Sequence, residues 1–134
     1  MADKSYVSVK CDAKDLFDSA LKSGLIKAMT TTITDAINNK SSSKLTTKDK
    51  SDEGFILTAT LTSLKADDKD KPTKLDAKLA LTVMTIGSTT KAFNGTSGGS
   101  ANGIGSKIQE AAEDLVTGIL DDFMPKVIKT MLSL

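Results

Sequence analysis

Two Ser-x-x-Lys sequences have the residue types and the spacing of a site for covalent catalysis. They pair Ser41 with Lys44 and Ser88 with Lys91. In penicillin-binding enzymes this spacing places a nucleophilic hydroxyl and an activating amine one helical turn apart. Here both pairs lie in turns rich in Ser, Thr and Lys, and the chain has no Ser-Asp-Asn or Lys-Thr-Gly sequence to complete such a site. We therefore predict no catalytic residue, with a small Ser/Lys hydrolase as the alternative.

The composition argues against other kinds of active site. The 134 residues include no His, and all 18 basic residues are Lys. The lack of His removes the usual general base and the commonest metal ligand, and the lack of Arg removes the bidentate phosphate fork. A net charge of +1, with four Phe, one Tyr and no Trp, offers little field or stacking surface to nucleic acid. We expect no cofactor, no metal and no nucleic-acid partner.

Three aspartates and a glycine-rich stretch are the remaining candidates for ligand binding. Asp67, Asp68 and Asp70 lack the alternating ligands and closing Glu of a calcium loop, and neighbouring lysines offset their charge. Residues 94–105 are rich in Gly and Ser but contain no phosphate-loop sequence. We predict a solvated turn at the aspartates and a flexible return loop for residues 94–105.

Apolar residues that alternate with polar ones predict the strands that must support any site. The alternation is clear at residues 5–11, 54–64 and 75–83, and weaker at about 89–97. A short edge strand is expected near Leu45. The lone Cys11 continues the apolar side of the first strand, so it is expected to be a small buried hydrophobe.

Two helices follow from apolar spacings of three and four residues. The first is expected to be capped by Asp12 and to end near residue 39, and the second to begin at a capping box in residues 106–109. Pro125 predicts a kink or break in the second helix. We predict a single α+β domain over residues 1–134, a two-layer sandwich in the order β-α-β-β-β-α. Its antiparallel-rich sheet of four or five strands carries both helices on one face.

Two surfaces of this sandwich are candidates for binding a protein partner. The sheet face opposite the helices is expected to carry Thr58, Thr60, Thr62, Asp76 and Lys78. The first helix has small residues at i, i+4 and i+8, namely Ala20, Gly24 and Ala28. That stripe indicates close packing within the fold or, alternatively, a homodimer contact.

The chain resembles a group of small Gram-negative periplasmic and outer-membrane lipoproteins. The similarity rests on the Ala-containing helix at 17–37, the Thr-faced strand at 55–64 and the Gly/Ser strand at 92–101 that runs into a helix at 108–123. The group includes penicillin-binding-protein activators and curli-secretion-channel-like proteins. The resemblance implies a bacterial envelope location and a scaffolding or partner-binding role without catalysis. Such proteins carry a lipidated cysteine after a signal sequence, and Cys11 has no lipobox before it.

We therefore expect a non-enzymatic envelope protein of the periplasm or outer membrane that binds another protein and is a monomer or weak homodimer. Contact with a membrane is expected only through a lipid anchor on a removed leader, because residues 1–5 contain no hydrophobic signal region. Without such a leader the location would be cytoplasmic. The alternative function is a subunit of a homo-oligomeric phage or secretion assembly.

Overall fold

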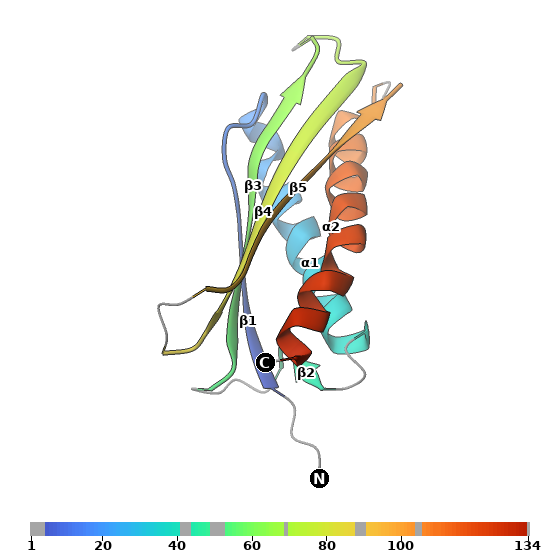
Figure 1. The fold of residues 1–134 in the computed structure, drawn as a ribbon. Helices are drawn as coiled ribbons and strands as arrows, with labels where there is room; N and C mark the ends of the chain where they lie inside the picture. Colours follow the sequence, from blue (N-terminus) through green and yellow to red (C-terminus); the bar gives the residue numbers. More distant parts are fainter. Residues whose placement is uncertain are drawn as a thin grey trace.

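A five-stranded sheet with two helices packed on one of its faces makes up the fold (Figure 1). The computed structural model describes residues 5–40, 44–48, 53–68, 70–87, 91–103 and 106–133. These confirm the α+β class and the predicted order of elements. In chain order the elements are β1 (Ser5–Ala13), the 3-10 turn η1 (Ser19–Leu21), α1 (Lys22–Lys40), β2 (Leu45–Thr46), β3 (Phe55–Ala66), β4 (Lys74–Thr85), β5 (Lys91–Asn102) and α2 (Ile108–Leu132).

The sheet is mixed, in the order β2-β1-β3-β4-β5. Strand β1 pairs in parallel with both β2 and β3, and α1 is the crossover that a parallel connection requires. Strands β3, β4 and β5 form an antiparallel meander. Strand β5 is therefore one edge of the sheet, beside α2.

The core lies between the inner sheet face and the two helices. Leu79 and Leu81 have no exposed surface, which confirms the predicted phase of β4. In the register Leu61 stands opposite Leu79 and Leu57 opposite Val83, so one face of the β3–β4 pair is continuous apolar surface. The helices cover this face with buried residues at three- and four-residue spacing.

The first helix begins later than predicted, and Asp12 does not cap it. Strand β1 continues to Ala13, which pairs with Leu61 of β3. Beyond the strand, the Phe17 N–H donates to the Leu64 carbonyl at 3.0 Å, so these residues still follow β3. The actual cap is Asp18, whose side chain accepts a hydrogen bond from the Ala20 N–H at 3.0 Å. Pairing with a strand distant in sequence overrides the local capping signal of Asp12.

Of the predicted kink or break at Pro125, a break is excluded, because α2 continues through Pro125 as one helix. Pro125 lies on the exposed side of the helix. Asp121, whose carbonyl loses its N–H partner, is exposed as well, so that carbonyl can be hydrated, while Met124, Val127 and Ile128 continue the buried stripe. The predicted capping box is also absent: Lys107 is the N-cap residue, and no side chain caps the helix.

Two glycines with positive φ lie at ends of the strands β3 and β4, and they differ in the space available for a side chain. Gly54 has φ +123°, and a Cβ there would lie 2.1 Å from the Tyr6 carbonyl oxygen. Gly87 has φ +85°, but a Cβ there would meet nothing within 4 Å. We expect Gly54→Ala to lower the free energy of unfolding by more than ~2 kcal/mol, and Gly87→Ala by about 1 kcal/mol. Urea unfolding measures both, and equal losses would contradict the close approach at Tyr6.

Candidate functional site

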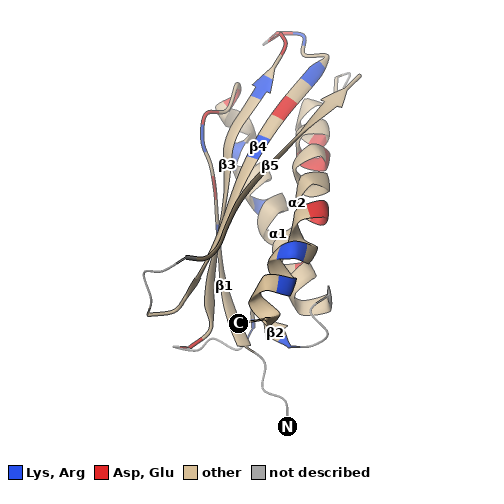
Figure 2. Cartoon of the chain, viewed as in Figure 1, with Lys and Arg blue, Asp and Glu red and all other residues tan. Residues whose placement is uncertain are grey.

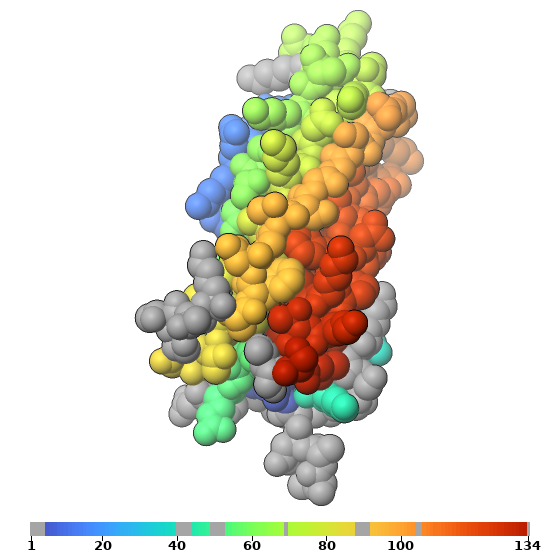
Figure 3. Space-filling model, in the orientation of Figure 1, coloured from blue at the N-terminus to red at the C-terminus, as the bar shows by residue number. Residues whose placement is uncertain are grey.

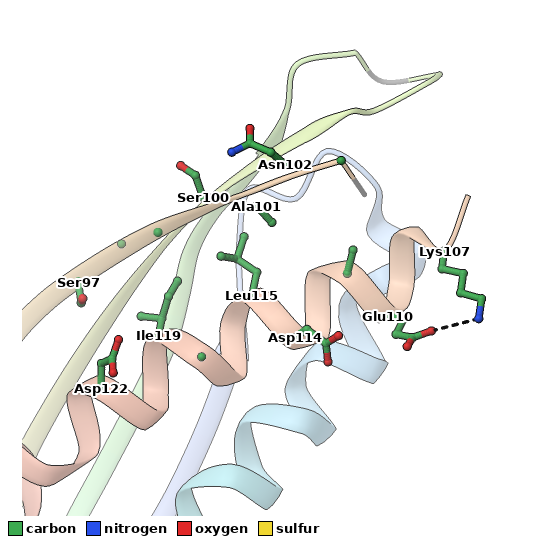
Figure 4. A pocket seen from close by; sticks show the side chains of 15 residues that line it. Ser97, Ser100, Ala101, Asn102, Lys107, Glu110, Asp114, Leu115, Ile119 and Asp122 are labelled. Atoms are coloured by element: carbon green, nitrogen blue, oxygen red, sulfur yellow. Dashed lines mark ion pairs between the residues drawn. The ribbon is translucent and has the colours of Figure 1, made fainter. Parts of the chain in front are cut away.

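A groove of about 690 Å³ lies between the edge strand β5 and the outer flank of α2. Residues 97–103 form its upper side, and α2 residues between Lys107 and Asp122 form its lower side (Figure 4). In the space-filling view β5 and α2 lie side by side on one face of the molecule (Figure 3). A long strand edge and a long helix flank thus meet along one groove.

The edge of β5 that faces the groove has no partner strand among the described residues. The strand is twelve residues long, and from residue 92 to 102 it contains no charged residue and no Pro. Figure 2 shows this part of the sheet edge without charge. Natural proteins usually protect an edge with Lys, Pro, a bulge or a short strand, and the opposite edge strand, β2, has two residues. In β5 the Lys and a register shift against β4 both lie at the start of the strand, at residues 91–93. From residue 93 to 102 the β5 edge therefore retains the backbone groups needed to accept another strand.

Glycines bring β5 close to α2. A Cβ at Gly95 would lie 3.2 Å from Cζ of Phe123, and a Cβ at Gly99 would lie 3.1 Å from Cγ1 of Ile119. Phe93 packs edge-on against Phe123 with the ring centroids 5.9 Å apart. Because β5 pairs with β4 as far as Asn102, the strand predicted at about residues 89–97 extends into residues 98–102, where a return loop was predicted. The four-residue spacing of Gly95 and Gly99 on one strand face was the signal that could have identified it.

The outer flank of α2 carries an acidic row. Glu110, Asp114 and Asp122 line the groove at multiples of four residues, and Gly118 occupies the remaining position of this row. A Cβ at Gly118 would meet nothing within 4 Å, so this position is a gap in the wall. We call Glu110, Asp114, Gly118 and Asp122 the acidic row. In the ribbon of Figure 2, acidic residues are coloured toward the N-terminal half of α2 and lysines toward its C-terminal end.

Apolar side chains form the floor of the groove beside this row. Ala111 and Leu115 are partly buried against the core, and Ile119 is buried. In Figure 4, Leu115 and Ile119 project from α2 toward β5. The groove thus combines an unpaired backbone edge, an apolar floor and an acidic wall, which is an arrangement for holding an extended polypeptide segment.

The predicted partner-binding residues on the sheet lie on the opposite face from the helices, as expected. Thr58 pairs with Thr82, and Thr60 with Ala80, on this outer face. Thr62 lies at a register shift, where its hydroxyl donates to the Lys78 carbonyl at 3.1 Å. Asp76 and Lys78 are exposed on β4. The fold brings these five residues onto one surface, remote in chain order from the residues of the groove.

The small-residue stripe of the first helix is divided between two environments. Ala20 is exposed in η1, whereas a Cβ at Gly24 would lie 2.5 Å from Nε2 of Gln109 on α2. Ala28 is half-buried in α1. Packing between α1 and α2 of the same chain thus accounts for Gly24, and a role of the stripe in dimerisation stays a prediction.

Of the Ser-x-x-Lys residues and Cys11, for which no chemistry is expected, the structure describes only some. Ser41, Ser88 and the side chain of Lys91 lie outside the described residues. Cys11 is half-buried against the core, and this burial raises the pKa of its thiol despite a hydrogen bond with Thr30. The protonated thiol is a poor nucleophile. Within the described residues no group of three or more His, Cys, Asp or Glu side chains is placed to hold a metal ion.

Asp67 organises the turn between β3 and β4. Its carboxylate accepts hydrogen bonds from the Thr73 hydroxyl at 2.5 Å and from the backbone N–H groups of Thr73 and Lys74, each at 2.9 Å. The Asp68 carboxylate accepts from the Asp70 N–H at 2.9 Å. These hydrogen bonds hold the pKa of the Asp67 carboxyl well below its usual range, and the bond from the Thr73 hydroxyl has the largest effect. The aspartates therefore stabilise their own turn.

A depressed pKa at Asp67 gives a stability contribution that is present above the ordinary carboxyl pKa and is lost as the pH falls toward the folded-state value. We expect the Asp67 side chain to remain ionised at pH 3 in an NMR titration. The Thr73→Ala variant should raise the pKa of Asp67 because it removes the strongest of these hydrogen bonds. An Asp67 that titrates with the ordinary pKa in wild type would contradict the turn geometry.

The two helix glycines predict opposite changes in stability. Gly118→Ala should raise the free energy of unfolding by about 0.5 to 1 kcal/mol, since alanine is the better helix former and its Cβ enters open space. Gly24→Leu should lower it by about 1 to 3 kcal/mol, because the side chain would collide with Gln109 and Glu113. Thermal unfolding of both variants measures the difference. A neutral Gly24→Leu would mean that the helices are not in close contact there.

Comparison with known proteins shows the fold and no sequence family. Neither a protein-family model nor a curated protein matches the sequence. A Xanthomonas campestris protein of the DUF330 family model has a similar structure, with a TM-score of 0.65 at 10% identity over 95% of this chain and 85% of that one. A minor lipoprotein from Acinetobacter baumannii matches with a TM-score of 0.53 at 11% identity over 98% and 92%. The PelC dodecamer from Paraburkholderia phytofirmans gives 0.52 at 8% identity over 90% and 89%.

At these identities the likeness establishes the fold alone. That fold is shared with a DUF330-type protein, a minor lipoprotein and PelC, which agrees in part with the resemblance to small lipoproteins. In the described part of the chain, neither helix combines the length and the apolar character needed to cross a membrane. The chain has the architecture of these proteins without a detectable sequence relationship to a family.

Proposed function

We propose that this chain is a non-enzymatic protein of the bacterial envelope, with an accessory or scaffolding role, that binds an extended segment of another protein as a sixth strand on β5. The unpaired twelve-residue edge of β5 beside the groove carries the proposal. In such β-augmentation, main-chain hydrogen bonds supply affinity and the side chains of the groove supply selectivity. This binding needs no reactive group.

A further observation supports the location. The fold is also that of a minor lipoprotein, which favours an envelope location.

A homo-oligomeric assembly is the second candidate, favoured by the fold likeness to the PelC dodecamer. In that case the strand added to β5 would belong to a second copy of this chain. Association through the outer sheet face at Thr58 and Thr60 is a third arrangement. The three differ in which surface is covered and in what covers it.

Photo-crosslinking in bacterial cells tests these surfaces against one another. A photoreactive amino acid at Asn102 or Lys107, on the rim of the groove, should give an adduct with a protein in the envelope fraction. The same amino acid at Thr60, on the outer face, should give none. Gly118→Phe should abolish the groove adduct because it fills the gap in the wall, while the matched Gly118→Ala should retain it.

The other outcomes assign the function differently. An adduct at Thr60 alone would move the binding site to the outer sheet face. A groove adduct with the mass of two copies of this chain would favour the homo-oligomer. An absence of adducts at all three positions would overturn the proposed protein-binding function.

A further inference from the structure

We infer that the segment added to β5 is cationic, with its positive side chains on the face that points toward α2. This inference rests on the proposed function and adds the chemistry of the partner. It follows from the acidic row, the gap at Gly118 and the absence of positive charge on β5 from residue 92 to 102. The expected pattern is a basic residue, a second basic residue two positions on, a large apolar residue after two more, and a third basic residue after two more, in either chain direction.

The spacing of the acidic row matches that of one face of a strand. Residues four apart on an α-helix are separated by about 6 Å along its axis. Side chains on one face of a strand recur every two residues, or about 6.6 to 6.8 Å. From Glu110 to Asp122 the two series differ by about 2 Å in total, well within the reach of a lysine side chain. One strand can therefore present a residue to each position of the acidic row.

The charges of the acidic row are largely uncompensated within the described structure. Glu110 lies 3.9 Å from Lys107, but the two side chains are 66% and 80% exposed, so this ion pair contributes little. No described lysine lies within ion-pair distance of Asp114 or Asp122. A cationic strand would supply three positive charges to these carboxylates and would exclude part of the surrounding water, which strengthens each attraction.

Gly118 is the one position of the acidic row without a carboxylate. Adjacent to it, Leu115 and Ile119 form an apolar floor, and a Cβ at Gly118 would meet nothing within 4 Å. A large apolar side chain fits here, because it would cover the floor without displacing any described atom. The row thus selects two kinds of residue, basic at three positions and apolar at one.

A second copy of β5 does not meet these requirements. From residue 92 to 102 the strand carries no charged residue, so it would place no cation opposite the acidic row. Strand β2, at the other edge of the sheet, has two residues and is too short to fill the groove. No other segment of the sequence has the expected pattern of three basic residues and one large apolar residue, in either direction. The complementary occupant is therefore a basic segment of a different protein.

Peptide binding to the full chain, measured by fluorescence anisotropy, tests the inference. The probe is a labelled peptide, Thr-Val-Lys-Thr-Lys-Thr-Leu-Thr-Lys-Val-Thr, assayed together with its reverse order because pairing can be parallel or antiparallel. The control, Thr-Lys-Val-Thr-Lys-Thr-Leu-Lys-Thr-Val-Thr, has the same composition but divides its lysines between both faces. We expect one direction of the patterned peptide to bind at least 10-fold more tightly than the control.

Charge variants of α2 locate the effect. The double variant Glu110→Gln with Asp114→Asn should weaken binding of the patterned peptide by about 10-fold or more and reduce its salt dependence. Asp121→Asn is the matched control, since Asp121 is exposed on α2 but does not line this groove, and it should change the affinity less than 2-fold. Gly118→Phe should prevent binding, whereas Gly118→Ala should not.

The outcomes separate this inference from the proposed function. If patterned and control peptides bind equally and Gly118→Phe removes both, the edge accepts strands but the cationic pattern is wrong. Equal losses from the double variant and from Asp121→Asn would also overturn the pattern, since the effect would be one of overall charge. If no peptide binds, the inference fails, and the crosslinks at Asn102 and Lys107 decide separately whether the groove binds a protein. Sedimentation of wild type as an oligomer that Gly118→Phe dissociates would identify a second copy as the occupant.

Discussion

The close packing of β5 on α2 is the contact on which the C-terminal half of the structure depends. A Cβ at Gly95 or Gly99 would lie 3.1 to 3.2 Å from side-chain atoms of the neighbouring Phe and Ile residues, tighter than an ordinary contact. A large side chain at either position would therefore push the strand away from the helix. The same closeness leaves the next flank of α2, the acidic row, directly beyond the sheet edge. The close packing of β5 on α2 thus closes the core at this edge of the sheet and also places one wall of the groove.

The sequence predicted those parts of the fold that have a clear residue period. Leu79 and Leu81 identified the buried face of β4 because polar residues alternate with them. Strand β5 was obscured because Gly95 and Gly99 have no side chain to show a period. Asp12 has the composition of a helix cap, but its place in β1 is decided by pairing with β3, nearly fifty residues away. Pro125 is compatible with a helix because the Asp121 carbonyl that it leaves without a partner lies on the exposed side, which a linear sequence does not show.

The groove could not be predicted because an unpaired strand edge is a property of the assembled sheet. Residues 92 to 102 show no charge and no Pro in the sequence, but this composition also suits a loop. It becomes informative when the strand order places β5 at the edge. The acidic residues of α2 likewise suit any solvated helix face. Their four-residue spacing acquires meaning once Gly118 and the sheet edge lie beside them.

The outer sheet face and the groove differ in how their charges are satisfied. On the outer face Lys65 stands opposite Asp76, and the Ser100 hydroxyl donates a hydrogen bond to the Asp76 carboxylate. These charges have neighbours of the fold itself, and together with the threonines they make a face that is stable in water. In the groove, by contrast, Asp114 and Asp122 have no cation within ion-pair distance among the described residues, and the strand edge above them has no partner strand. A surface whose backbone and charged groups are held only by water gains more from a partner than one whose groups already pair within the fold, so the groove is the stronger candidate for recognition.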